Sequence, residues 1–205
     1  MSSQYGQDVF VRNSFFPDLL SGTFVEVGAY DGLTLSNTAL FERLGWRGVC
    51  VEATLEDFER LKVNRPGADC VYGASYDRDG TVVFRRVDGA PRMLSGVAEA
   101  HDPRHVARIR REGGSLAEVV VPCHRLDGLL AARGIAHVEY MSIDVEGGEA
   151  AVLRGLGAAA AGVDVMTIED NYGQAALFDE ILRDTHERRE ASLGCDLLYV
   201  RRGFA

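Results

Sequence analysis

The chain has 205 residues, of which 46% are hydrophobic, and a formal net charge of -9 at pH 7. This size and composition predict one globular domain with a sizeable apolar core. The acidic balance disfavours a nucleic-acid partner, because contacts between phosphates and basic side chains supply most of the affinity for nucleic acids. The most basic stretch, 104–111, is therefore interpreted as a solvated helix face.

The ends and the cysteines of the chain indicate the compartment. The N-terminal residues lack the basic-then-apolar pattern of a signal peptide. Every apolar run is too short or too polar for a membrane span. The four cysteines form no C-x-x-C pair, and three of them lie in apolar runs, as reduced core residues do. We expect a cytoplasmic protein without a membrane partner, and the oligomeric state cannot be predicted.

The predicted elements alternate between strands and helices. Short β-branched runs predict strands at 23–28, 48–53, 68–75, 118–126, 137–144 and 163–170. Helical patterns predict helices at 36–45, 55–64, 126–134, 147–156 and 174–184. Residues 80–87 add a strand, and 189–203 predict a closing antiparallel hairpin with Gly194 at its turn. Together these elements predict an α/β fold, a Rossmann-like, doubly wound and mostly parallel sheet in one domain spanning 1–205.

One stretch interrupts this alternation. Residues 88–117 contain few large apolar side chains, several glycines and one predicted helix near 102–112. Such an insertion can lie over a ligand site as a lid, or it can be a mobile loop without a role. The sequence leaves both interpretations open.

Polar residues follow several predicted strands where each strand ends. In doubly wound sheets, ligands bind outside the carboxyl ends of the strands. This rule places Glu26 to Gly32, Glu52, Ser75, Asp144 and 169–171 along one rim. The same rim is therefore predicted to hold the ligand site.

The first of these strand ends predicts a nucleoside site. It carries Gly28-x-x-x-Gly32, which differs from the G-x-G-x-x-G of a dinucleotide site and so disfavours an NAD-dependent oxidoreductase. Glycines at such a turn let a ligand approach the backbone closely. Glu52, at the end of the second strand, can accept hydrogen bonds from both hydroxyls of a ribose. We expect a nucleoside without a pyrophosphate.

Three motifs sharpen this expectation. They are SQYGQD at Ser3–Asp8, VGAYDG followed by SNT at Val27–Thr38, and SIDVEGGEAAVL at Ser142–Leu153. Together they resemble the FkbM family of class I S-adenosylmethionine-dependent methyltransferases. The resemblance implies that Glu26, Gly28 and Tyr30 line the methionine part of the cofactor, that Gln4, Gln7 and Asn37 help hold its amino-acid end, that Glu52 holds the ribose, and that Ser75 and Tyr76 edge the adenine. It also places Tyr5, Gly32, Ser36, Ala53 and Asp144 in the cofactor site.

The acids at two later strand ends predict a metal site. The strands that end in Asp144 and Asp170 should be neighbours, which would gather Asp144, Glu169, Asp170 and Asn171. Carboxylates that lie this close repel one another, and a hard cation such as Mg²⁺ or Mn²⁺ removes the conflict. The layout also resembles magnesium-dependent catechol-type O-methyltransferases, although Gly147 stands where those enzymes place a catalytic lysine. Alternatively, Asp144 accepts a hydrogen bond from a substrate hydroxyl without a metal.

Two further acids, Glu146 and Glu149, fall at the predicted start of the helix at 147–156, where negative charge favours the helix dipole. Both are assigned mainly to this role, and Glu146 is also a candidate substrate contact. Candidates for the catalytic base are Asp144, His124 and His101, with His105 as a further choice on the insertion.

These residues predict an O-methyltransferase that uses S-adenosylmethionine and Mg²⁺. The acid-rich and arginine-rich rim favours a hydroxyl of a sugar or short oligosaccharide, in glycan or polysaccharide biosynthesis, as the acceptor. Two alternatives remain: a metal-independent O-methyltransferase of a polyketide-type natural product, and a non-catalytic cofactor-binding module.

Overall fold

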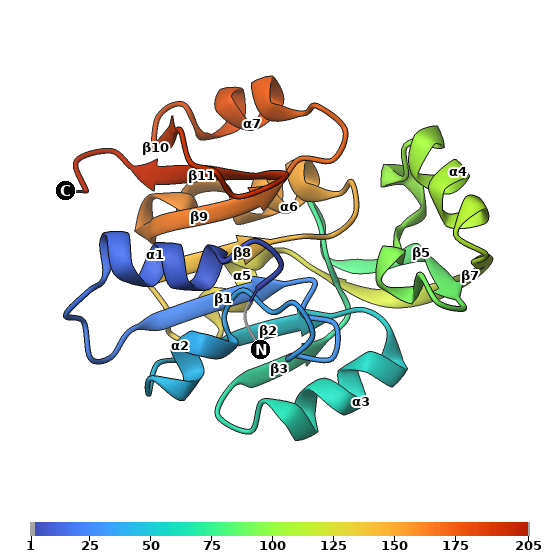
Figure 1. Cartoon of the computed structure of the whole chain (residues 1–205), viewed down its shortest axis with the longest axis horizontal. Helices are drawn as coiled ribbons and strands as arrows, with labels where there is room; N and C mark the ends of the chain where they lie inside the picture. The colour runs from blue at the N-terminus through green and yellow to red at the C-terminus, as the bar shows by residue number, and fades with distance from the viewer. Residues whose placement is uncertain (1–2, 205) are drawn as a thin grey trace.

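The computed structural model describes residues 3–204 and is built around a seven-stranded sheet (Figure 1). The strand order is β10-β11-β9-β8-β1-β2-β3. The parallel strands are β1 (Thr23–Val27), β2 (Arg47–Glu52), β3 (Asp69–Tyr72), β8 (Val138–Ile143) and β9 (Val163–Glu169). The strands β10 (His186–Arg189) and β11 (Asp196–Arg201) close the sheet in antiparallel pairing. This arrangement confirms the predicted doubly wound α/β fold.

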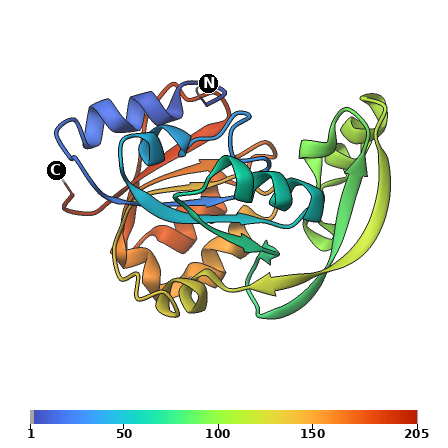
Figure 2. The ribbon, with the colours of Figure 1, turned by 90° about the horizontal axis from the view of Figure 1, so that it is seen from below.

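Helices cover both faces of this sheet. One face packs against α1 (Gln7–Phe15), α2 (Ala39–Arg43) and α3 (Leu55–Asn64), and the other against α5 (Leu126–Ala131), α6 (Glu149–Leu156) and α7 (Ala175–Leu182). Figure 2 shows the two sets of helices on opposite sides of the strands. Because both faces are covered, all seven residues of β9 are buried, which explains its continuous apolar pattern. The helix α1 was not predicted from the sequence.

A second, four-stranded sheet stands beside the first and was also not predicted. Its order is β4-β7-β5-β6. The strands are β4 (Ala74–Ser75), β5 (Gly80–Asp88), β6 (Gly96–Val97) and β7 (Ser115–His124). The single strand predicted at 68–75 is therefore two strands in two sheets, with Gly73 between them at a φ of +136°. A Cβ at Gly73 would lie 2.8 Å from the carbonyl oxygen of Pro122, so glycine is needed at this crossing.

The insertion at 88–117 is folded. It contains two short 3-10 helices (Arg92–Leu94 and Ala98–Ala100), β6, and the helix α4 (Pro103–Arg111), which confirms the predicted helix near 102–112. Val87, Leu94 and Ile109 form a small core of their own beneath α4. Figure 1 shows α4 above the outer ends of β5 and β7, to one side of the large sheet.

Two further predictions concern cysteines and membranes. The four cysteines are free thiols, with Cys50 and Cys123 buried and Cys70 and Cys195 partly exposed. Within residues 3–204, no helix has both the length and the hydropathy needed to cross a bilayer.

Candidate functional site

Two adjoining cavities open at the carboxyl ends of β1, β2, β8 and β9. The first runs toward β2 and β4, and its lining includes Glu52, Ala53 and Ser75. The second runs toward the N-terminal segment and β11, and its lining includes Gln7, Asn37 and Glu169. Six residues line both cavities: Val27, Gly28, Tyr30, Met93, Asp144 and Glu146. The two cavities are therefore parts of one continuous site.

The first cavity presents two polar groups that suit a nucleoside. The Glu52 carboxylate accepts hydrogen bonds from the backbone N–H groups of Tyr30 at 2.9 Å and Thr54 at 2.6 Å. Burial raises the pKa of Glu52 to about 7, against the effect of these bonds. The buried Ser75 hydroxyl has no hydrogen-bond partner within residues 3–204. Each carboxylate oxygen of Glu52 keeps a further lone pair, and the Ser75 hydroxyl is unpaired among the described residues, so both side chains can bind a ligand.

Three predicted cofactor residues have mainly structural surroundings. At Gly28, a Cβ would lie 1.8 Å from the carbonyl oxygen of Asp144, so this glycine is required by the neighbouring backbone and not only by a ligand. At Gly32, a Cβ would meet the Arg65 and Leu61 side chains at 2.6 Å. Tyr76 is buried in the core beneath the small sheet and lies outside the described lining of both cavities.

The N-terminal segment supplies one wall of the second cavity. Gln4, Tyr5 and Gln7 all line it. The Gln7 side chain accepts a hydrogen bond from the Tyr5 backbone at 2.9 Å and donates one to Asp196 at 2.8 Å. The wall therefore joins residues that are 189 positions apart in the sequence.

Glu26 lines the second cavity, but its carboxylate is occupied by contacts with other residues of the protein. It accepts hydrogen bonds from the hydroxyls of Ser36 and Thr38 and from the backbone of Asn37. The buried Arg65 guanidinium lies 3.1 Å from it. These contacts fix the SNT segment and leave the Asn37 side chain facing the cavity. Its amide donates to the Ser142 hydroxyl at 2.9 Å, while its buried carbonyl oxygen has no partner within residues 3–204.

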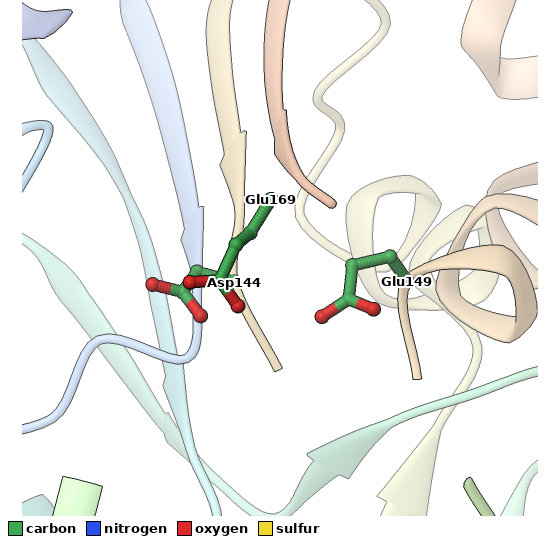
Figure 3. Close-up of side chains that lie close together, drawn as sticks. All are labelled: Asp144, Glu149 and Glu169. Carbon is green, nitrogen blue, oxygen red and sulfur yellow. The ribbon is translucent and has the colours of Figure 1, made fainter. Parts of the chain in front are cut away.

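Three carboxylates lie close together around Asp144, which lines both cavities (Figure 3). Glu169 lines the second cavity, and Glu149 lies outside the described lining of both. Asp144, Glu149 and Glu169 each offer an oxygen, and these oxygens lie within 4.8 Å of one another. Burial, followed by the neighbouring charge of Glu169, raises the pKa of Asp144 well above its usual range. Burial and the nearby acids Glu146 and Glu149 raise the pKa of Glu169 to about 8. The cluster carries more negative charge than its surroundings stabilise, so it should hold protons or a cation.

The composition of this cluster differs from the predicted metal site. The parallel pairing of β8 with β9 brings Asp144 and Glu169 together as predicted. Asp170, in contrast, accepts hydrogen bonds from the backbone N–H groups of Gln174 at 2.6 Å and Ala175 at 3.0 Å, at the start of α7. Asn171 lines the second cavity. The third carboxylate of the cluster is Glu149, which the sequence analysis assigned only to a helix start.

Glu149 also shapes the turn that follows β8. Its carboxylate accepts hydrogen bonds from the backbone N–H groups of Val145 and Gly147, both at 3.0 Å. This closes a turn in which Glu146 has a φ of +59° and Gly147 a φ of +111°. Glu146 is only 8% exposed and lines both cavities.

The predicted histidine bases lie outside the described lining of both cavities. His124 ends β7 in the small sheet, and its Nε2 lies 3.2 Å from the Tyr72 carbonyl oxygen. The His101 ring packs against the His105 ring at a tilt of 48°, with the ring centroids 4.5 Å apart, and burial lowers the pKa of His101 to about 3. In this geometry Asp144 is the one predicted base that lines the site.

The insertion contributes to both cavities. Met93 lines both, Arg92 lines the first, and Arg108 of α4 lines the second. Arg92 forms an ion pair of 2.6 Å with the buried Asp57 of α3. At the other end, Arg104 of α4 donates to the Tyr172 carbonyl oxygen at 3.1 Å. These two contacts hold the insertion across the site.

Comparisons with known proteins identify the family and the fold of the chain. A model of the methyltransferase FkbM domain matches residues 26–189. A TehB-like SAM-dependent methyltransferase from Corynebacterium glutamicum has a similar structure, with a TM-score of 0.52, 10% identity, and 98% of this chain and 89% of that chain covered. The METTL16 methyltransferase domain gives a TM-score of 0.55 at 9% identity, with 98% of this chain and 67% of that chain covered.

A putative rRNA-methylase from Clostridium thermocellum gives a TM-score of 0.50 at 10% identity, with 98% of this chain and 96% of that chain covered. No curated protein matches the chain. The likeness to the solved structures shows the fold, which is that of the class I methyltransferases.

Proposed function

Because the chain belongs to the FkbM methyltransferase family and is therefore an S-adenosylmethionine-dependent methyltransferase, we propose that it methylates a hydroxyl of a sugar or short oligosaccharide. The observation that carries this proposal is the cluster of Asp144, Glu149 and Glu169, of which Asp144 lines both cavities. A cluster of acids at the point of transfer suits an acceptor that must be held by its hydroxyls and lose a proton.

The two cavities suit the two halves of the cofactor. We place the adenosine in the first cavity, with its ribose hydroxyls on Glu52 and its adenine edge near the unpartnered Ser75 hydroxyl. The amino-acid end then lies in the second cavity, near Gln7 and the unpartnered carbonyl oxygen of Asn37. Buried polar atoms without partners are costly, so a ligand that pairs with both of them gains affinity.

The acid cluster prepares the acceptor. When bound, S-adenosylmethionine supplies a methyl group on a positively charged sulfur, which an oxygen nucleophile attacks in line. Asp144 lines both cavities, so it can accept a hydrogen bond from the acceptor hydroxyl and take up its proton. The Glu169 carboxyl lies beside Asp144, and its pKa of about 8 means that it holds a proton at neutral pH. The insertion residues Met93 and Leu94 supply apolar side chains to the lining of the second cavity.

A divalent cation fits the same cluster. Three carboxylates with raised pKa values form the oxygen-rich, negatively charged donor set that Mg²⁺ or Mn²⁺ prefers. We propose that Asp144, Glu149 and Glu169 hold it, and that its charge would lower the pKa of an acceptor hydroxyl. In the metal-independent alternative, Asp144 acts as the base without a cation.

The second cavity favours a polar acceptor. Apart from the groups placed at the cofactor, its wall combines acids and amides with few aromatic side chains: Gln4, Glu169, Asn171 and Asp196. A polyhydroxylated molecule can pair with such groups, whereas a polyketide would need apolar walls. A nucleic acid would meet repulsion, because the walls and the net charge of -9 are both negative.

The proposal is tested by following S-adenosylhomocysteine release on a panel of methyl glycosides and short oligosaccharides, with Mg²⁺ and with EDTA. We expect release above background with at least one member of the panel, and a loss of that release in EDTA. Full activity in EDTA would contradict only the metal. Activity confined to a polyketide or an RNA would contradict the acceptor class.

A further inference from the structure

Glu146 occupies the point where the two cavities meet. Of the six residues that line both cavities, only Asp144 and Glu146 are charged, and both are acids. Asp144 belongs to the acid cluster, where it faces Glu169. Glu146, which is 8% exposed, is the acid that the mechanism above does not use.

The Glu146 carboxylate lacks a protein partner. Its buried Oε2 atom has no hydrogen-bond partner within residues 3–204. The Nδ1 atom of His105 lies 3.5 Å away. The Nε2 atom of that histidine faces the Leu94 carbonyl oxygen at 2.8 Å, so Nε2 carries the proton. Nδ1 then accepts the hydrogen bond from the Tyr172 hydroxyl at 2.5 Å and has no proton to donate to Glu146.

Burial, followed by the neighbouring acids Asp144 and Glu149, raises the pKa of Glu146 well above its usual range, so a proton or a cation must stabilise this group. No charged basic side chain within residues 3–204 pairs with it directly. Arg108 acts on it through space, but the Arg108 guanidinium donates to Glu112 at 3.0 Å on the same helix. Burial and lowered pKa keep His105 neutral. A buried carboxylate oxygen without a partner is costly, and it implies a ligand group that completes it.

The backbone at Glu146 is held in a costly conformation. A φ of +59° is unfavourable for any residue with a Cβ, and it persists here because Glu149 ties the turn from both sides. Asn or Gly would fit this position with less strain. Glutamate therefore occupies the junction although its backbone conformation there favours glycine or asparagine.

We propose that Glu146 recognises the positive charge on the sulfur of S-adenosylmethionine and so distinguishes the cofactor from its product. The inference rests on the proposed placement of the cofactor across both cavities. With adenosine in one cavity and the amino-acid end in the other, the sulfur that joins them lies at the junction, beside the residues that line both. The positively charged sulfur is then the group that pairs with the Glu146 carboxylate oxygen that has no partner among the described residues.

The reaction removes this attraction. The methyl carbon forms a bond to the acceptor oxygen as its bond to sulfur breaks, and the electron pair of the broken bond stays on sulfur, which becomes a neutral thioether. The hydroxyl proton goes to the acid cluster. Glu146 then faces an uncharged sulfur, so the product S-adenosylhomocysteine binds less tightly than the cofactor and leaves.

The test compares ligands that differ in charge at this atom. Affinities for S-adenosylmethionine, S-adenosylhomocysteine and sinefungin, in which a protonated amine replaces the methylsulfonium, are measured by calorimetry in EDTA. The variants are Glu146→Gln and, as a matched control, Glu180→Gln, which removes the same charge from an exposed position on α7. Thermal melting verifies that each variant is folded.

In Glu146→Gln we expect the preference for the two charged ligands over S-adenosylhomocysteine to fall about tenfold, which corresponds to about 1.4 kcal/mol. Affinity for S-adenosylhomocysteine should stay within threefold of wild type, and Glu180→Gln should retain the wild-type preference. An unchanged preference in Glu146→Gln overturns the inference and leaves the proposed function intact. If that variant fails to fold, Glu146→Gly, which relaxes the backbone, gives the same comparison. A wild type that binds none of the ligands overturns the placement of the cofactor itself.

Discussion

Glu52 shows how a single side chain can define a binding site. Both of its carboxylate oxygens already accept backbone N–H bonds, so the group is fixed in place and points its remaining lone pairs into the first cavity. A glutamine in its place would turn an NH₂ group toward one of those N–H donors. The side chain would then rotate away or lose a bond.

We therefore predict that Glu52→Gln weakens binding of S-adenosylhomocysteine by about tenfold or more, as the loss of a charge-assisted pair would. Calorimetry measures the affinity. The matched control is Glu59→Gln, since Glu59 is exposed on α3 and forms an ion pair with Lys62. Equal affinities for Glu52→Gln and wild type would contradict the assignment of Glu52 to the ribose.

Glu169 makes the cation-free protein sensitive to pH. Its pKa is raised from 4.5 to about 8 by burial and by nearby acids. The folded protein therefore keeps a proton that the unfolded chain releases, so the stability from this group is full below pH 4.5 and is lost as the pH rises toward 8.

The variant Glu169→Gln should remove this loss. Relative to wild type, we expect it to gain stability between pH 5 and pH 8, by an amount on the order of a few kcal/mol in the free energy of unfolding. Urea denaturation in EDTA at several pH values measures this difference. Mg²⁺ should stabilise wild type more at pH 8 than at pH 5. A difference that is constant with pH would show that Glu169 is charged throughout.

At the scale of elements, the helix α7 explains why Asp170 is not in the acid cluster. The two backbone N–H groups at the start of the helix take up both of its oxygens. Sequence alone placed Asp170 correctly at the end of β9, because strand periodicity and parallel topology fix where a strand ends. It could not decide between a metal and a helix start as the partner of the carboxylate, since both need the same residue at the same position.

We predict that Asp170→Ala costs about 1 kcal/mol of stability, as the loss of a helix cap does, and lowers the melting temperature by roughly 2–4 °C. Affinity for S-adenosylhomocysteine should be retained. Asp184→Ala, at a position that is largely exposed, serves as the control for the loss of one acid. Loss of methyl transfer without a loss of stability would instead make Asp170 a member of the active site.

The insertion is the element that the sequence described least well. Its helix could be predicted from the pattern around 102–112, but its strands β6 and the first part of β7 could not, because they are short and pair with β5 across a long loop. The placement of Met93, Arg92 and Arg108 at the cavities depends on contacts with α3 and Tyr172 that no local pattern encodes.

For the molecule as a whole, alternation of apolar strands and helices was enough to predict the doubly wound sheet and the rim that carries the site. The cofactor residues near β1 and β2 followed from the family resemblance, and most of them line the cavities. The second sheet was missed because it depends on one conformation at Gly73, where the chain leaves the large sheet. The role of Glu149 was missed because its turn brings a helix residue back to a strand end.

The central claim is that the acid cluster around Asp144 performs hydroxyl methylation. The most direct test is the rate of S-adenosylhomocysteine release by wild type and Asp144→Asn on the best sugar acceptor of the panel. The account predicts that the variant loses turnover by at least about a hundredfold, a typical contribution of a positioned base, while its S-adenosylhomocysteine affinity stays within threefold of wild type. Full turnover by Asp144→Asn would contradict the account.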